Sequence, residues 1–143
     1  MTVKAILKQK GDRVVAVRPD DTVGSVCSIL DKERIGAVLV RDADQRVIGV
    51  VSERDVVRSI ARLGRDMLDH TVSSIMTRDV QFCSPEDSVD QVMAQMTDRR
   101  IRHLPVLKRG KLVGMISIGD VVKQRIADHE MEAEAMKAYI ATG

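Results

Sequence analysis

The segment Val14-Val-Ala-Val-Arg-Pro-Asp-Asp-Thr-Val-Gly-Ser-Val26 returns 66 residues later as Val80-Gln-Phe-Cys-Ser-Pro-Glu-Asp-Ser-Val-Asp-Gln-Val92. A second segment, Gly49-Val-Val-Ser-Glu-Arg-Asp-Val-Val57, returns 65 residues later as Gly114-Met-Ile-Ser-Ile-Gly-Asp-Val-Val122. Two matches at nearly the same period indicate one duplicated supersecondary unit. Because a unit of this size is short of a complete core, we expect each copy to bury its apolar face against the other. Function is then expected between the halves.

The composition is that of a soluble globular domain with one sizeable core. The chain has 143 residues, of which 44% are hydrophobic and 31% are charged. The formal net charge of +2 mixes both signs along the chain, so a nucleic-acid partner is not expected. No apolar stretch is long enough to span a membrane and the N-terminus lacks a secretory signal, so we expect a cytoplasmic protein.

Cysteine and aromatic residues give few candidates for chemistry. Cys27 and Cys83 stand where the other copy has Met93 and Val17, so both are interpreted as small core residues rather than disulfide or metal ligands. With one Phe and one Tyr in the chain, a bound purine has to lie between aliphatic side chains.

Each copy has the pattern of a β-α-β-β-α unit. Prolines end the first strands, and Thr22 and Ser88 are predicted to cap the first helices. Ser52 and Ser117 are predicted to open the second helices. The expected strands are 14–17, 37–40 and 47–51 in the first copy, and 80–83, 104–107 and 112–116 in the second.

These elements divide the chain into a first repeat at 3–63, a linker at 64–70, a second repeat at 71–126 and a C-terminal helical extension at 127–143. Apolar residues on the last helix are sparse, which favours contact with a partner or a frayed end over a place in the core. They are Ile126, Ala133, Met136 and Ile140.

A Ser-x-x-Asp motif follows the last strand of each copy, as Ser52 with Asp55 and as Ser117 with Asp120. One interpretation is purely structural, since such a pair forms a capping box worth about 0.5–2 kcal/mol. A functional interpretation is favoured by its presence at the same place in both copies. A hydroxyl and free N–H groups at a helix start suit a phosphate, and an aspartate one turn in can accept both hydroxyls of a ribose.

Arg102 and His103 stand at the entry to a strand where the first copy has Gly36 and Ala37. Since the duplicated scaffold does not need charge there, the pair suggests a bound anion. No histidine accompanies the two serines in both copies, and the histidines lack metal-ligand spacing. We therefore predict no enzymatic activity, no catalytic residue and no metal site.

Four strings of residues resemble the CBS domain family, and the chain resembles a stand-alone tandem CBS pair over roughly residues 3 to 126. The strings are 35–40, 49–55, 102–106 and 114–120. The resemblance implies an α/β (α+β) fold in which two repeats pack about a pseudo-two-fold axis into one module. It also implies two clefts that commonly bind adenosine nucleotides, and modules that pair into a dimeric disc.

The resemblance implies which residues meet the nucleotide. In the family, the aspartate of the motif holds the ribose and the hydroxyl residue meets phosphate, which gives Asp55 with Ser52 and Asp120 with Ser117. Adenine is framed by first-strand residues, here Val14, Ala16, Val80 and Phe82. Arg102 and His103 are expected to reach phosphate in the Asp55 cleft, assisted by Arg54. Because Gly36-Ala37 and Phe82 depart from the pattern, the Asp120 cleft is expected to bind more weakly, to take a less charged adenosine compound or to stay empty.

The leading hypothesis is a regulatory sensor that binds AMP, ADP, ATP or NAD(H) and changes the conformation of the module or of its homodimer. The alternative is a ligand-independent dimeric adaptor, in which Ser-x-x-Asp only caps helices and the C-terminal helix recruits a partner. The sequence leaves open the preferred adenosine ligand, the number of occupied clefts, any Mg²⁺ dependence, and the regulated protein.

Overall fold

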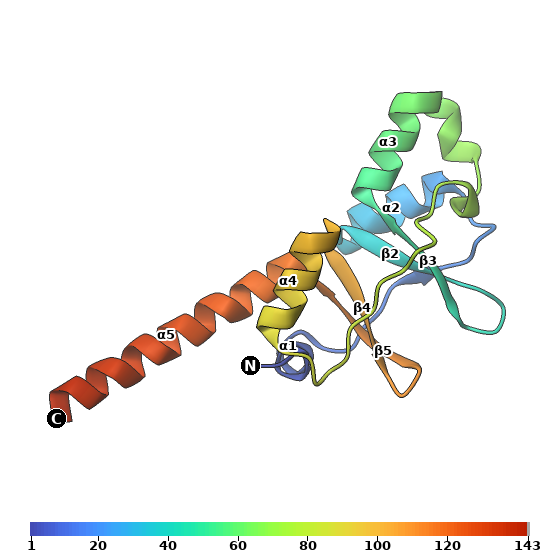
Figure 1. Ribbon diagram of the computed structural model, residues 1–143. Coiled ribbons are helices and arrows are strands. Elements are labelled where there is room, and N and C mark those ends of the chain that lie inside the picture. The colour runs from blue at the N-terminus through green and yellow to red at the C-terminus, as the bar shows by residue number, and fades with distance from the viewer. Residues whose placement is uncertain (143) are drawn as a thin grey trace. The chain divides into compact units, whose positions relative to one another are not determined.

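A computed structural model describes residues 1–142 and shows a mixed α/β fold (Figure 1). The elements are α1 Val3–Lys10, β1 Ala16–Val17, α2 Val23–Glu33, β2 Ala37–Arg41, β3 Val47–Ser52, α3 Glu53–Leu63, the 3-10 helices η1 Arg65–Asp69 and η2 Val72–Ser74, α4 Val89–Arg99, β4 His103–Lys108, β5 Lys111–Ser117 and α5 Ile118–Thr142. The chain divides into two compact units. One is Val14–Val80, and the other joins Met1–Arg13 to the residues from Gln81 onward.

The boundaries of these units show that the two copies exchange their leading segments. The segment before the first copy, which forms α1, contributes Val3 and Ile6 to the core built around the second copy. The segment before the second copy, which contains η2, contributes Val72 and Met76 to the core of the first. Each copy is therefore completed by the segment that precedes its sibling in the sequence.

The unit 14–80 is built on a three-stranded sheet in the order β1-β2-β3. β1 runs parallel to β2, and β2 runs antiparallel to β3. Helices α2 and α3 also contribute to its core, in which the strand residues Val38, Val40 and Val51 have no exposed surface.

The second unit is built on the β4-β5 hairpin, with α4, α5 and α1 around its core. The turn Arg109-Gly110 has positive φ at both residues, 51° and 78°, as the type I′ turn of a two-residue hairpin requires. The predicted hairpins and helix starts are confirmed. Thr22 and Ser88 cap α2 and α4 by accepting hydrogen bonds from the N–H groups of Ser25 and Gln91.

The predicted strand at 80–83 is wrong. Only Cys83 pairs with β4, through a single parallel bridge to Val106. In the first unit the N–H of Leu39 donates to the carbonyl of Val15, which extends the ladder upstream. Proline occupies the matching place in β4, at Pro105, and has no N–H to donate, so the second ladder stops after one bridge.

The interpretation of Cys83 as a core residue is confirmed, since it is 5% exposed and burial, with a smaller effect from Asp87, raises the pKa of its thiol to about 12. Cys27 is half-buried against the other core, and both cysteines are free.

The segment 64–70 is more structured than a linker, because η1 buries Met67 to 2% exposure.

Glycine is required in the last strand of each copy by the exchanged segment. A Cβ on Gly49 would lie 2.5 Å from the sulfur and 3.2 Å from the Cβ of Met76, and one on Gly114 would lie 2.6 Å from Leu7.

Gly49→Ala is therefore expected to lower the free energy of unfolding by about 1–3 kcal/mol, as overpacking does. Urea unfolding measures the change. Gly119→Ala is the control, because a Cβ there would meet only Ser117 Oγ, at an ordinary contact distance of 3.6 Å, and alanine favours helix. An equal loss in both variants would contradict this account.

Candidate functional site

The Ser52-Asp55 pair forms a closed capping box at the start of α3. The carboxylate Oδ2 of Asp55 accepts hydrogen bonds from the Ser52 N–H at 2.9 Å and the Ser52 hydroxyl at 3.1 Å, and the Asp55 N–H donates to Ser52 Oγ at 3.3 Å. The other oxygen, Oδ1, receives the Thr77 hydroxyl at the long distance of 3.4 Å. Both residues of the motif are half-buried. The box fixes the carboxylate and leaves Oδ1 weakly bonded.

The Ser117-Asp120 pair forms the same box at the start of α5. Its three hydrogen bonds measure 2.9, 3.0 and 3.2 Å. The surroundings differ, because the ammonium of Lys10 donates to Asp120 Oδ2 at 2.6 Å and to the Met115 carbonyl at 2.8 Å. The carboxylate of the second motif is thus held in an ion pair within its own unit.

Lys10 donates a hydrogen bond to the aspartate of the second motif, as Thr77 does to the aspartate of the first. The Thr77 N–H donates to the Val50 carbonyl at 2.9 Å, and Val50 matches Met115 as the residue after the strand glycine. In each unit, then, one residue of the exchanged segment donates both to this carbonyl and to the motif aspartate. A neutral hydroxyl meets Asp55, whereas a cation meets Asp120.

This difference changes the titration of Asp120. Burial raises the pKa of its carboxyl, but hydrogen bonds from Lys10 and Ser117 and the charge of Lys10 outweigh burial and hold the pKa below its usual value. The carboxylate is therefore ionised at neutral pH, with its charge compensated by Lys10.

The register of the hairpins places Arg102 and His103 at the positions that Gly36 and Ala37 occupy in the other unit, as the alignment of the two copies predicts. His103 pairs with Ser117 across β4 and β5, as Ala37 pairs with Ser52 across β2 and β3. The Ile118 N–H donates to the Arg102 carbonyl, and the matching bond in the other unit runs from Glu53 to Gly36. The Arg102 side chain is exposed and His103 is half-buried. His103 therefore begins β4 beside the second motif, and Arg102 directly precedes it.

Four of the remaining predicted site residues lie at the start of the two copies. Ala16, in β1, is exposed. The other three are half-buried: Val14, Val80 and Phe82. The Phe82 carbonyl accepts a hydrogen bond from Gln95 of α4. Arg54 is exposed on the first turn of α3.

Comparison with known proteins decides the family. The family model described as "CBS domain" matches residues 3–62 and again residues 72–126. The chain belongs to the CBS domain family. A curated relative, the "CBS domain-containing protein CBSX3, mitochondrial" of Arabidopsis thaliana, is 35% identical over 150 residues, which cover 99% of this chain and 73% of the plant protein.

Solved CBS structures share the fold. The CBS-domain containing protein ATU1752 from Agrobacterium tumefaciens superposes with a TM-score of 0.85 at 46% identity, covering 87% of this chain and 92% of that one. The CBS domain pair of protein MJ0100, solved with 5-methylthioadenosine and S-adenosyl-L-methionine, gives a TM-score of 0.79 and covers 90% of this chain and 98% of that one. At 22% identity, the second likeness shows the fold alone.

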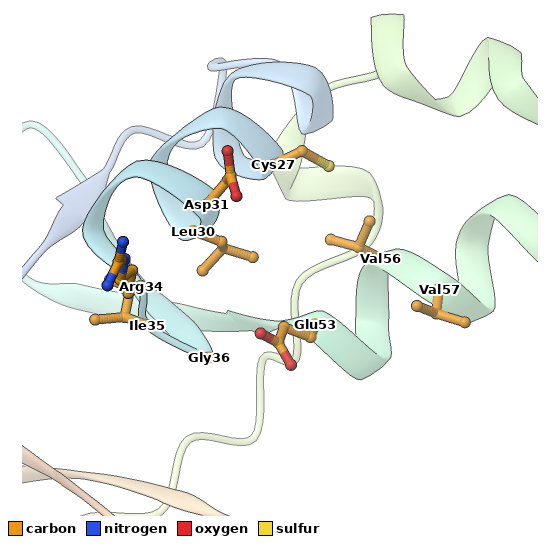
Figure 2. A pocket seen from close by; sticks show the side chains of 9 residues that line it. All are labelled: Cys27, Leu30, Asp31, Arg34, Ile35, Gly36, Glu53, Val56 and Val57. Atoms are coloured by element: carbon orange, nitrogen blue, oxygen red, sulfur yellow. The ribbon is translucent and has the colours of Figure 1, made fainter.

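An open pocket of about 690 Å³ lies between helices α2 and α3 of the first unit (Figure 2). Leu30 of α2 and Val56 of α3 face each other across it. The residues that line it are Cys27, Leu30, Asp31, Arg34, Ile35, Gly36, Glu53, Val56 and Val57. Its lining includes Glu53, which lies within the Ser-x-x-Asp motif, but neither Ser52 nor Asp55, so the pocket adjoins the capping box without being lined by its two side chains.

Sequence reasoning missed Lys10 and Thr77, both of which lie in the segments that the CBS repeats exchange. The positional match between the two leading segments, in which Leu7 and Met76 pack against equivalent glycines, aligns Thr77 with Lys8 and so does not point to Lys10. Among residues 1–142, no group of three or more His, Cys, Asp or Glu side chains can hold a metal ion. Within the same range, no helix is both long enough and apolar enough to cross a membrane.

The Lys10–Asp120 ion pair predicts how stability depends on pH. Because the folded pKa of Asp120 is lowered, its stabilising effect is present above the unfolded pKa of about 3.9 and is lost as the pH falls through the folded value. Lys10→Met is expected to lower the free energy of unfolding at pH 7 by about 0.5–1 kcal/mol, a modest figure because both side chains are partly exposed.

Urea unfolding at pH 7 and pH 3 measures this effect. The difference between the wild type and Lys10→Met should be smaller at pH 3 than at pH 7, because pH 3 lies below the unfolded pKa of about 3.9, where the stabilising effect of the lowered Asp120 pKa is being lost. Lys8→Met, an exposed lysine on the same helix, is the matched control and should have little effect at either pH. A Lys10→Met penalty that stays constant between the two pH values would count against the ion pair as its source.

Proposed function

We propose that this CBS pair is a regulatory sensor that binds an adenosine-containing ligand, with Asp55 accepting the ribose hydroxyls. The observation that carries the proposal is the state of the Asp55 carboxylate. Ser52 holds its Oδ2 in place, while among residues 1–142 the only hydrogen bond to Oδ1 is the long one from Thr77. An oriented carboxylate with one weakly bonded oxygen can accept hydrogen bonds from a diol without losing the cap.

The ligand class is supported by family likeness at the level of the fold. The MJ0100 pair was solved with two adenosine compounds, 5-methylthioadenosine and S-adenosyl-L-methionine. CBS pairs are typically regulatory modules, which favours a sensor over an enzyme. For this chain we propose AMP, ADP, ATP or NAD(H), with Arg102, His103 and Arg54 supplying positive charge for phosphate.

The main role proposed for Ser52 is to orient the Asp55 carboxylate, and phosphate binding comes second. Its hydroxyl accepts from the Asp55 N–H and donates to the Asp55 carboxylate, so its single proton is already used. Donation to a phosphate would require that proton to leave Asp55. The ribose hydroxyls can take its place, because they are donors that the same carboxylate can accept.

A ligand bound in this way regulates only if it binds two conformations of the protein with unequal affinity. The proposed output is a change in the conformation of the module or of its homodimer. Residues distant from Asp55 then respond through the α3 helix that begins at this motif.

Substitution of Asp55 tests the proposal. Asp55→Asn keeps the size of the side chain and an acceptor for the Ser52 N–H but removes the charge. Wild-type protein should show a rise of several degrees in melting temperature at a ligand concentration about 100 times the Kd, which corresponds to about 2.7 kcal/mol. The variant should lose this shift. The panel is AMP, ADP, ATP, NAD⁺, NADH and S-adenosylmethionine, with GTP as the base control.

Asp120→Asn is the matched control, because it changes the same cap in the other motif. A shift with adenine compounds that only Asp55→Asn abolishes is the expected result. No shift with any member of the panel would overturn the sensor proposal and leave the dimeric adaptor as the better account.

Lys10 predicts that the two motifs differ in affinity. A ribose that approaches Asp120 has to compete with an ammonium at 2.6 Å, whereas at Asp55 it competes with a hydroxyl at 3.4 Å. We expect 5-methylthioadenosine, an uncharged probe that gains nothing from the lysine charge, to bind wild-type protein at one site per chain. Lys10→Met should add a second, measurable site by titration calorimetry. Unchanged stoichiometry in Lys10→Met, matching Lys8→Met, would refute the competition.

A further inference from the structure

The C-terminal part of α5 is exposed on every side. Helix α5 runs without a break from Ile118 to Thr142, and each residue of 129–142 is exposed. Figure 1 shows this part of the helix extending beyond the rest of its unit. Isolated helices shorter than about 12–15 residues are marginal in water, and most helical stability in proteins comes from tertiary packing. Residues 129–142 bury no side chain in their own unit, so packing against a partner would stabilise them.

Six residues along one side of α5, five of them apolar, repeat with alternating spacings of four and three. Val122, Ile126, Met136 and Ile140 are 42%, 54%, 59% and 70% exposed. With His129 and Ala133 they occupy consecutive a and d positions of a heptad repeat, in the order Val122, Ile126, His129, Ala133, Met136, Ile140. A strict period of 3.5 residues is the signature of a coiled-coil seam.

This seam is turned away from the unit that carries it. The core side of α5 is marked by Val121 and Gln124, which are buried, and by Asp128, which pairs with the N-terminal ammonium at 3.8 Å. At 3.6 residues per turn, the centre of the seam lies about 125° around the helix from the centre of those residues. It is therefore available to a second molecule without any change in the core.

The charges beside the seam are complementary between two parallel copies. Glu132 is at a g position and Lys137 at the e position five residues later. In a parallel, in-register pair, each Glu132 faces Lys137 of the second copy, which gives two ion pairs between oppositely charged side chains. Arg125 and Glu130 repeat this relation one heptad earlier, although Arg125 also pairs with Asp90 of its own chain.

The other apolar face of the helix lacks this complementarity. It consists of Met131, Ala135 and Ala138, with Glu134 and Tyr139 at the flanking positions that would meet. These side chains are smaller on average, and the flanks offer no pair of opposite charges. The seam, with its larger residues and matched charges, is the face that fits a second copy.

We propose that residues 122–140 of α5 form a parallel, in-register, two-stranded coiled coil with the same helix of a second copy of this chain. The inference does not depend on the ligand proposed above. It gives the apolar residues of the seam a binding partner, and it predicts which helix joins the two copies in the homodimer.

Disulfide trapping tests the arrangement. In a Cys27→Ala/Cys83→Val background, Met136→Cys places a thiol at a d position, where the two copies meet in a parallel, in-register pair. Met131→Cys is the matched control, since Met131 is equally exposed, at 63%, but lies on the opposite side of the helix. On mild oxidation of dilute protein, Met136→Cys should form the covalent dimer at least tenfold faster than Met131→Cys. Equal rates, the reverse order or no dimer from Met136→Cys overturns the proposal.

Charge exchange tests the orientation. Glu132→Lys and Lys137→Glu each put like charges opposite one another in a parallel homodimer and should weaken self-association several-fold in sedimentation equilibrium. An equal mixture of the two variants restores both ion pairs and should form heterodimers preferentially. The double variant Glu132→Lys/Lys137→Glu should associate as the wild type does. Failure of both the mixture and the double variant to recover association would exclude the parallel pairing.

Discussion

The packing of a side chain over a strand glycine is the constraint on which both units depend. Met76 covers Gly49 and Leu7 covers Gly114, at distances that no residue with a Cβ could allow without rearrangement. Each covering residue comes from the segment that precedes the other copy. The duplication is therefore not two independent repeats laid end to end, because each core needs apolar residues from a segment distant in the sequence. The same packing carries Thr77 and Lys10 to the motif aspartates.

Duplication of the Ser-x-x-Asp box has produced two sites with the same backbone and different electrostatics. The hydrogen bonds within the boxes agree to about 0.1 Å, so the helix cap alone does not distinguish them. The distinction comes from one donor outside each box, a hydroxyl in one unit and an ammonium in the other. Capping is an adequate structural reason for the serine in both boxes. A ligand-binding role for Asp55 rests on the oxygen that the cap does not use.

The features that sequence reasoning predicted correctly are those set by local chemistry. Thr22, Ser52 and Ser88 accept hydrogen bonds from residues three positions later, and the hairpins follow from turn residues between short apolar runs. The strand at 80–83 could not be excluded in this way, since the missing donor is Pro105, more than twenty residues away. Lys10 was missed for the same reason, because its contact with Asp120 spans 110 residues. The family resemblance identified the motif but not the lysine beside it.

Helix α5 begins at the Asp120 box and ends at the tip of the seam, with no break between them. Its 25 residues at about 1.5 Å each make a rod about 37 Å long. Such a rod is a lever whose short arm is the first turn, so a tilt of about 10° at Asp120 displaces the far end by about 6 Å. The Asp120 carboxylate and the far end of α5 are thus joined by one continuous helix. A change too small to alter the fold of the unit would be magnified at the end of that helix, in the segment that we propose pairs with a second copy.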